Sequence, residues 1–222
     1  MAGRFYPADP TALRSLVDAL VEDVSVAPDG DPATGYVVPH AGYSYSGATA
    51  ARVYALLRHH ADRIDRVVLV GPAHYVPLRG CAAPAVAGWV TPLGEVPIDL
   101  DGVRDLSRDG HVAVDDGPHA PEHSLEVQLP FLQRVLAPGT PILPIVVGAS
   151  SVDATRATLS AAATAGTVVL CSTDLSHYQH QTVAEQQDAR TAQAVLDLAA
   201  DRVGVRDACG VFALRGTLGW AR

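Results

Sequence analysis

The chain has 222 residues, of which 48% are hydrophobic and 18% charged, and its formal net charge is −8. This length fits one large domain with a substantial core, and the negative charge argues against nucleic acid or an anionic membrane as the main partner. No stretch approaches the roughly 20 apolar residues that a membrane-spanning helix needs, and the N-terminus has no apolar run of signal-peptide type. The three cysteines are far apart and form no CxxC pair, which favours a reducing, cytoplasmic setting.

Apolar runs and helical spacings alternate along the chain, which predicts secondary structure in the following order. A helix is expected over residues 10–23, with Asp9 as its cap and Pro10 at its first position, followed by a loop over 28–32. Core strands are expected at 35–39, 66–70, 141–147 and 167–171, a hairpin at 84–89 and 95–99, and helices at 47–57, 100–107, 122–136 and 183–200, with a last helix after 207–210. This alternation predicts a single α/β domain with a largely parallel or mixed sheet and helices on both faces.

Three of the predicted core strands run directly into polar turns that carry histidine. His40 follows the first strand, His74 the second, and Asp174 with His177 the fourth. Ligands bind at the carboxyl edge of open α/β sheets, and converging imidazoles are typical metal ligands. A lone buried histidine is more often structural, and the sequence does not show that these strands are neighbours. Spacing alone therefore leaves a metal site and a set of structural histidines as equal alternatives.

Several familiar catalytic signatures are absent from the chain. There is no GxSxG nucleophile elbow, no GxxxxGK[ST] phosphate-binding loop, no GxGxxG after a strand and no HExxH zinc motif. Residues 109–121 are expected to form a loop with His111 and His119 on its surface. His123 is expected at the start of the helix over 122–136, in which Pro130 would introduce a kink.

Seven stretches carry a resemblance to a known family: AGRFYPADP, VVPHAGYSYSG, VVLVGPAHY, EHSLEVQLPFL, ILPIVVG, STDLSHY and DACG. In this order they cover nearly the whole chain and resemble the MEMO family, whose prokaryotic members are called AmmeMemoRadiSam system protein B. That family is similar in fold to the class III extradiol dioxygenases, whose iron is held by two histidines and a carboxylate. The family usually continues past the DACG helix with a TSGD-like motif and a final strand, so residues 1–222 are expected to form a single MEMO-like domain that lacks this segment.

The resemblance also implies roles for individual residues. His40 and His74 match the metal-binding histidines, and Cys209 stands where the dioxygenases have their carboxylate. His177 matches the acid/base histidine, and Asp174 is its expected orienting partner. The residues expected to line the pocket are His123, Tyr43, Tyr45 and Tyr75. Cys81 and Cys171 fall in no family site motif and are expected to be small buried residues.

A thiolate ligand is softer than a carboxylate and favours copper(I), zinc or iron–thiolate binding. The resemblance therefore implies a redox pocket that holds copper or iron but is not a true catechol dioxygenase, and that holds zinc or no ion as isolated. Two alternatives are a non-catalytic protein that binds phosphotyrosine-type peptides in the same pocket, and a zinc hydrolase with His177 as base. The family name implies radical SAM and AMMECR-type partner proteins.

Overall fold

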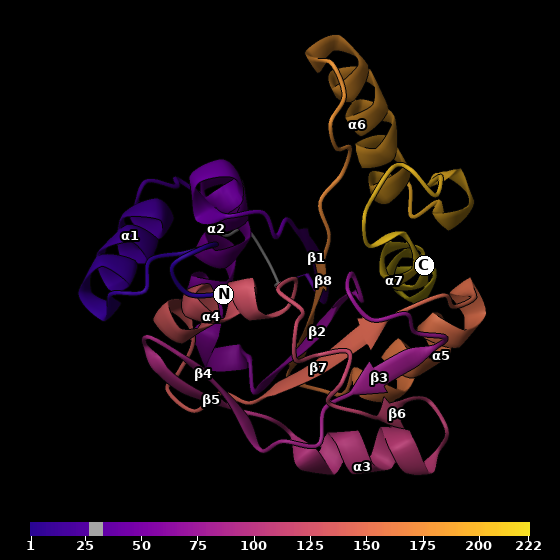
Figure 1. Ribbon diagram of the computed structural model, residues 1–222, viewed down its shortest axis with the longest axis horizontal. Helices are drawn as coiled ribbons and strands as arrows, with labels where there is room; N and C mark the ends of the chain where they lie inside the picture. Colours follow the sequence, from indigo (N-terminus) through magenta and orange to yellow (C-terminus); the bar gives the residue numbers. More distant parts are fainter. Residues whose placement is uncertain (27–32) are drawn as a thin grey trace.

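The computed structural model describes residues 1–26 and 33–222, and a mixed sheet forms the centre of this part of the chain (Figure 1). In order across the sheet, the strands are β1 (Gly35–Val38), β8 (Thr167–Ser172), β2 (Arg66–Pro72), β7 (Ile142–Val147), β3 (Cys81–Ala83) and β6 (Ala113–Val114). The first four run parallel, β3 is antiparallel to β7, and β6 is parallel to β3. The predicted α/β domain with a mostly parallel sheet is therefore confirmed.

The central strands are nearly continuous runs of valine, leucine and isoleucine because helices cover both of their faces. On one face lie α1 (Pro10–Glu22), α2 (Tyr43–His59) and α4 (Leu129–Val135); on the other lie α3 (Leu100–Arg108), α5 (Val152–Ala162) and α7 (Val211–Ala221) (Figure 1). The chain also forms short 3-10 turns at Ala61–Arg63, Glu126–Gln128 and Ala200–Arg202. Among the described residues, no helix is long and apolar enough to cross a membrane.

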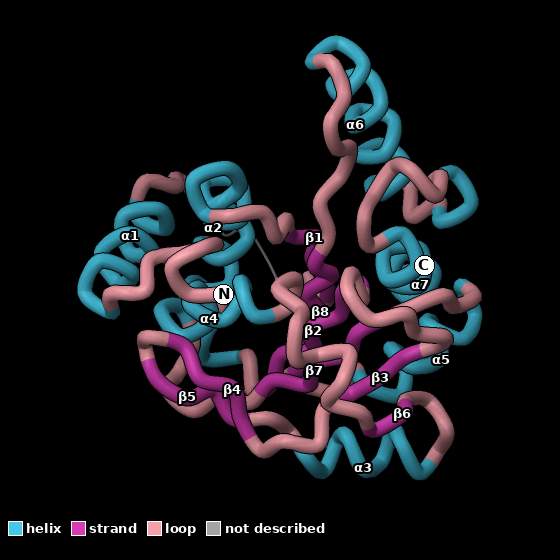
Figure 2. Tube along the Cα trace, in the orientation of Figure 1, coloured by secondary structure: helices cyan, strands magenta, loops and turns pink. Residues whose placement is uncertain are grey.

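Two elements stand apart from this layered body. The hairpin of β4 (Gly88–Thr91) and β5 (Gly94–Pro97) forms its own two-stranded sheet, as predicted. Helix α6 (Gln181–Leu196) extends away from the sheet at the top of Figure 1, and Thr191 and Ala194 are its buried residues. The segment that leaves β8 and enters α6 passes the carboxyl edge of the parallel strands (Figure 2).

Some boundaries differ from those predicted. Helix α2 begins at Tyr43 rather than Gly47, with Gly42 as its cap. The helix expected from residue 122 is a turn followed by a 3-10 segment, and α4 begins only at Leu129. Pro130 therefore occupies the first turn of α4, where its missing N–H costs nothing, instead of kinking a longer helix. The loop predicted at 28–32 lies outside the described residues.

The expectation that His119 lies on the surface is wrong. Its side chain is only 7% exposed, and its ring lies 5.6 Å from that of Trp89, centroid to centroid. The β4–β5 hairpin thus covers a loop whose polar composition suggested solvent exposure. Cys81 and Cys171 are buried and form no disulfide, as predicted.

Candidate metal centre

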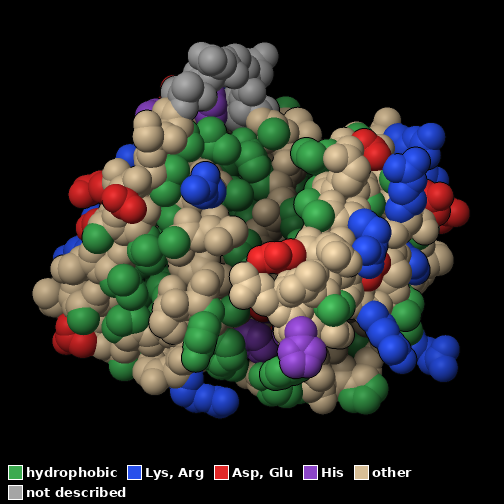
Figure 3. Space-filling model, turned by 90° about the horizontal axis from the view of Figure 1, so that it is seen from above, with side chains coloured by type: hydrophobic (Ala, Val, Ile, Leu, Met, Phe, Trp, Pro, Cys, Tyr) green, Lys and Arg blue, Asp and Glu red, His purple; other side chains and the backbone are tan. Residues whose placement is uncertain are grey.

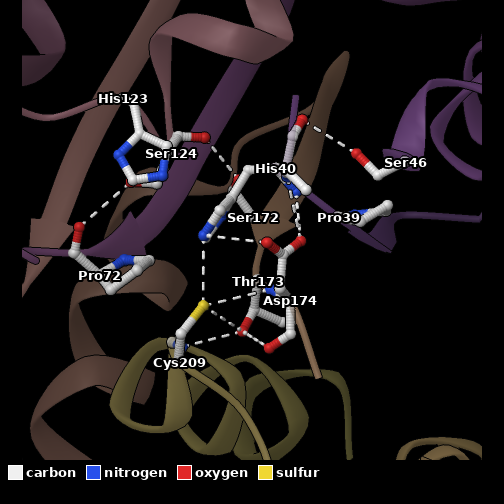
Figure 4. Close-up of polar contacts among 12 residues, drawn as sticks. Pro39, His40, Ser46, Pro72, His123, Ser124, Ser172, Thr173, Asp174 and Cys209 are labelled. Atoms are coloured by element: carbon white, nitrogen blue, oxygen red, sulfur yellow. Dashed lines mark hydrogen bonds and ion pairs between the residues drawn. The ribbon is translucent and has the colours of Figure 1, made fainter. Parts of the chain in front are cut away.

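The predicted site residues gather at the carboxyl edge of three neighbouring strands. His40 lies just after β1, His74 just after β2, and Asp174 just after β8. Because β8 pairs with both β1 and β2 in parallel, all three strands end at the same edge. The fourth residue, Cys209, reaches this edge from the segment that enters α7 (Figure 4). The topology therefore produces the convergence that the sequence could not establish.

Three histidines form the core of this cluster: His40, His74 and His123. Each offers one ring nitrogen, and these nitrogens all lie within 4.8 Å of one another. The ring centroids are 5.2 Å apart for His40 and His74, 5.3 Å for His40 and His123, and 4.9 Å for His74 and His123. The cluster could hold a metal ion. Zinc–nitrogen bonds are about 2.0–2.1 Å long, so two ligand nitrogens on one zinc ion lie no more than about 4.2 Å apart.

Buried hydrogen bonds determine which ring nitrogen of His40 carries the proton. The Ser172 hydroxyl lies 3.0 Å from His40 Nδ1, donates to the Ser124 carbonyl at 2.6 Å and accepts from Gln128 Nε2 at 2.8 Å. Its only proton is used on that carbonyl, so His40 Nδ1 must be the donor. The orientation of Gln128 is fixed in turn, because its Nε2 also donates to the Pro39 carbonyl at 3.0 Å. His40 Nε2 therefore faces the cluster, 3.2 Å from Cys209 Sγ.

Glu122 fixes the ring of His74 in a similar way. Its carboxylate lies 2.9 Å from His74 Nδ1 and accepts the backbone N–H of His74 at 2.6 Å. It also accepts the N–H groups of His123 and Ser124, at 3.0 and 2.9 Å. Burial raises the pKa of Glu122, but these hydrogen bonds outweigh it and lower the pKa to about 2. Carboxylates behind metal-binding histidines typically fix the ring and increase its basicity.

The role of Glu122 was not predicted. In the sequence Glu122 directly precedes His123, an order that does not match the HExxH motif. The available signal was a carboxylate directly before a histidine that was itself expected to line the pocket.

Cys209 is arranged to carry a negative charge. Its Sγ lies 3.2 Å from His40 Nε2 and accepts the backbone N–H of Asp174 at 3.2 Å (Figure 4). Burial raises the pKa of the thiol, but hydrogen bonds from His40 and His74 outweigh burial and lower the pKa to about 5. Burial lowers the pKa of His74, but its hydrogen bonds to Cys209 and Glu122 raise that pKa to about 9. Near neutral pH, Cys209 and His74 therefore form a thiolate–imidazolium pair in the metal-free protein.

The third histidine behaves differently. Burial and the neighbouring His40 lower the pKa of His123 to about 4, so its ring is neutral at pH 7. Its Nδ1 lies 3.2 Å from the Tyr75 hydroxyl, and its ring stacks on Phe5 with centroids 4.4 Å apart. A neutral imidazole with a packed ring is ready to act as a ligand.

Asp174 is bound more closely to the His40 turn than to His177. Its Oδ1 accepts the backbone N–H of His40 at 2.7 Å and that of Ala41 at 3.3 Å. Its Oδ2 lies 3.9 Å from Nε2 of both His40 and His177, which is beyond hydrogen-bonding distance. The side chain of His177 is 43% exposed at the edge of the cluster. Its role as an acid/base residue oriented by Asp174 stays a prediction.

The tyrosines expected to line the pocket occupy three different environments. Tyr75 is 53% exposed and contacts His123 through its hydroxyl. Tyr43 lies in the hydrophobic core, where its hydroxyl donates to the Val127 carbonyl at 2.7 Å and its ring packs on Phe131. Its core position does not fit the expected lining role, because the first turn of α2 directs the ring toward α4. Tyr45 is 88% exposed, and its lining role stays a prediction.

The face seen in Figure 3 includes histidine side chains near its lower centre, and arginine side chains gather on its right. The histidines are surrounded mainly by hydrophobic and uncharged atoms, with an acidic side chain close by.

We expect alkylation of Cys209 in the metal-free protein to reach half its maximal rate near pH 5. The thiolate is the nucleophile, and the pKa of Cys209 is lowered, so the reactive form is present above that pH and is lost below it. Peptide mass spectrometry after timed exposure to iodoacetamide measures the rate. The buried Cys81 and Cys171 serve as internal controls and should react slowly. A midpoint near that of a free thiol, about pH 8.5, would contradict the expected thiolate.

A second expectation concerns Ser172→Ala, which removes the acceptor that fixes the His40 proton. Loss of such an outer hydrogen bond typically weakens metal binding by about 10- to 100-fold. Zinc affinity, measured by competition with a chromophoric chelator, should fall by that factor. Ser46→Ala is the matched control, since that hydroxyl donates to the Ala41 carbonyl and contacts none of the histidines directly. Equal affinity in both variants would show that Ser172 does not orient His40.

Comparison with known proteins identifies relatives of the chain. A family model described as Memo-like protein matches residues 1–204. A MEMO1 family protein of Methanopyrus kandleri is 35% identical over 213 residues, covering 89% of this chain and 75% of the relative. Another, from Pyrobaculum arsenaticum, is 34% identical over 230 residues, covering 96% of this chain and 79% of the relative. The chain therefore belongs to the MEMO1 family of Memo-like proteins.

Proposed function

We propose that this protein is a metal-dependent redox protein that holds copper(I) or iron(II) with His40, His74 and Cys209. The observation that supports this most directly is the position of Cys209 Sγ, 3.2 Å from His40 Nε2, next to the histidine cluster. A soft sulfur beside two imidazoles suits copper(I), and the same set also accepts iron(II). When bound, either metal would supply one-electron exchange with an oxidant such as oxygen.

The residues around this centre would each have a separate role. Ser172 and Glu122 hold the rings of His40 and His74 with their Nε2 atoms directed inward. His123 adds a neutral imidazole on the side away from Cys209. His177, at the exposed edge, can exchange a proton with solvent, because its side chain is 43% exposed. The pocket thus combines a buried ligand set with one accessible proton carrier.

A second candidate function is zinc-dependent hydrolysis with His177 as base. It is favoured by the three histidines, because three histidine ligands with an open fourth position form a common catalytic zinc site. In this alternative Cys209 would be a neighbour of the metal rather than a ligand. The partner proteins, the peptide ligand and the dioxygenase-like fold are proposed on family resemblance, and the cytoplasmic location on the spacing of the cysteines.

Anaerobic titration with copper(I) and iron(II) tests the ligand set. One metal per chain is expected, and Cys209→Ser should weaken copper(I) binding far more than iron(II) binding, because oxygen replaces the donor that the softer ion prefers. Cys81→Ser is the matched control, since Cys81 lies buried against Thr158 outside the cluster. Equal losses for both metals would count against Cys209 as a ligand. Retained zinc binding in Cys209→Ser, together with its loss in His123→Ala, would instead support the zinc alternative.

Oxygen uptake with a panel of simple catechols tests the reaction. The iron(II)-loaded wild type should show little or no ring cleavage, because a thiolate changes the redox character of iron and is itself easily oxidised. Cys209→Glu restores a carboxylate at that position and is the variant in which cleavage would appear. Robust ring cleavage by the wild type would overturn the proposal that Cys209 withholds this chemistry.

A further inference from the structure

Thr173 is the first residue after β8, and its side chain lies between the end of this strand and Cys209 (Figure 4). The residue is only 2% exposed. Its backbone N–H donates to the Val38 carbonyl at 2.8 Å, so it is attached to the end of β1 as well. Thr173 is therefore a fixed point from which the sheet edge can hold Cys209.

Two hydrogen bonds attach residues 209–210, the turn that enters α7, to the residues after β8. The Cys209 N–H donates to the Asp174 carbonyl at 3.0 Å, and this bond needs only backbone atoms. The Gly210 N–H donates to Thr173 Oγ1 at 2.9 Å, and this bond needs the threonine side chain. Because Gly210 is buried, its N–H would be left unpaired without that hydroxyl, which is unfavourable.

The approach of this turn to Thr173 is close because residue 210 has no side chain. A Cβ atom on Gly210 would lie 2.9 Å from Thr173 Oγ1, 3.0 Å from Thr173 Cβ and 3.2 Å from Pro72 Cδ. A larger residue would therefore push the turn away from the ends of β8 and β2. Glycine at this position allows α7 to begin directly against the sheet edge.

The hydroxyl proton of Thr173 has two acceptors within reach. Thr173 Oγ1 lies 3.2 Å from the Asp174 carbonyl and 3.7 Å from Cys209 Sγ. Cysteine binds a metal as the thiolate, which can only accept hydrogen bonds. A charged acceptor forms a stronger hydrogen bond than a neutral one, so the proton is expected to turn from the carbonyl to the ionised sulfur. The sulfur would then accept this hydroxyl in addition to the Asp174 N–H, which lies 3.2 Å away.

We propose that Thr173 is the positioning residue of Cys209: its hydroxyl holds the turn at Gly210 and donates its proton to the Cys209 thiolate. These two hydrogen bonds fix the sulfur beside His40 before a metal binds. A ligand that is already in place loses less freedom on binding, so this arrangement increases the affinity for copper(I). The inference rests on the proposed function only in taking Cys209 as a copper(I) ligand.

The test compares Thr173→Val, which keeps the shape of the side chain without the hydroxyl, with Thr173→Ser, which keeps the hydroxyl. Anaerobic competition with a copper(I) chelator measures the affinity. Thr173→Val should weaken copper(I) binding by about 10- to 100-fold, the usual effect of losing an outer hydrogen bond, and Thr173→Ser should stay within about threefold of the wild type. Thr217→Val is the matched control, because it removes from α7 a buried hydroxyl that donates to the Ala213 carbonyl at 2.9 Å. It should not change the affinity.

A second background separates positioning of Cys209 from a general structural role. In Cys209→Ala the remaining copper(I) affinity depends on the histidines, so the addition of Thr173→Val should cause no further loss beyond about twofold. A residue that merely stabilises the fold would weaken binding by the same factor in both backgrounds, and that result would overturn the proposal. Wild-type affinity in Thr173→Val, or an equal loss in Thr173→Ser, would overturn it as well.

A metal-free measurement distinguishes this proposal from the proposed function. At about pH 8, iodoacetamide should alkylate Cys209 at least about threefold faster in Thr173→Val than in the wild type, because a thiolate with fewer hydrogen bonds is more nucleophilic. If the wild type binds no copper(I) but this difference is found, the redox function fails and the positioning role stands. An unchanged alkylation rate overturns the positioning role, whatever the metal binding. If Thr173→Val does not fold, Gly210→Ala displaces the same hydroxyl through its Cβ and should show the same two effects.

Discussion

The carboxylate of Glu122 is the group on which the arrangement of the histidine cluster depends most directly. It accepts hydrogen bonds from three backbone N–H groups and from the ring of His74, and its side chain is only 2% exposed. A buried carboxylate is tolerated only when it is fully hydrogen-bonded, so these donors must stay in place together. Since the donors belong to the turn after β2 and to the turn before α4, Glu122 ties two segments 48 residues apart into one structure.

A similar arrangement operates on the opposite side of the cluster. Ser172 and Gln128 form a buried network that begins at the Tyr54 hydroxyl, which donates to Gln128 Oε1 at 2.6 Å, and ends at His40. Each member has donors and acceptors matched, and such networks specify one geometry because no member can rotate without losing a bond. The two histidines are thus held by different groups, one charged and one neutral. Against the effect of burial, the bond to Cys209, together with the bond to Glu122, raises the pKa of His74, whereas the bond to Ser172 fixes the ring proton of His40 on Nδ1.

The sequence was most informative where local chemistry decides the structure. The four parallel strands β1, β2, β7 and β8 were predictable because buried parallel strands are continuous apolar runs, and the turns after β1, β2 and β8 were predictable because polar residues follow those runs directly. The short strands β3 and β6 were not predicted, and β6 lies in the stretch expected to be a loop. The convergence of His40, His74 and Asp174 was a hypothesis until the strand order became known. The burial of His119 was not predicted because Trp89, on the distant hairpin, covers it. The role of Glu122 was not predicted because its partner His74 lies on a distant segment. The start of α4 was placed too early because leucine spacing continues through residues that the Glu122 hydrogen bonds hold in a turn.

Helix α6 has a consequence for how the site could work. It stands away from the body, and few of its side chains are buried, so less packing energy restrains it than restrains α2 or α7. His177 lies on the segment that joins β8 to this helix, whereas His40, His74 and Cys209 are anchored to the sheet edge and to α7. The proposed proton carrier and the proposed ligands are therefore supported by parts of the molecule with different stability. If a substrate were to bind beside α6, it would reposition His177 at lower energetic cost than the histidines at the sheet edge.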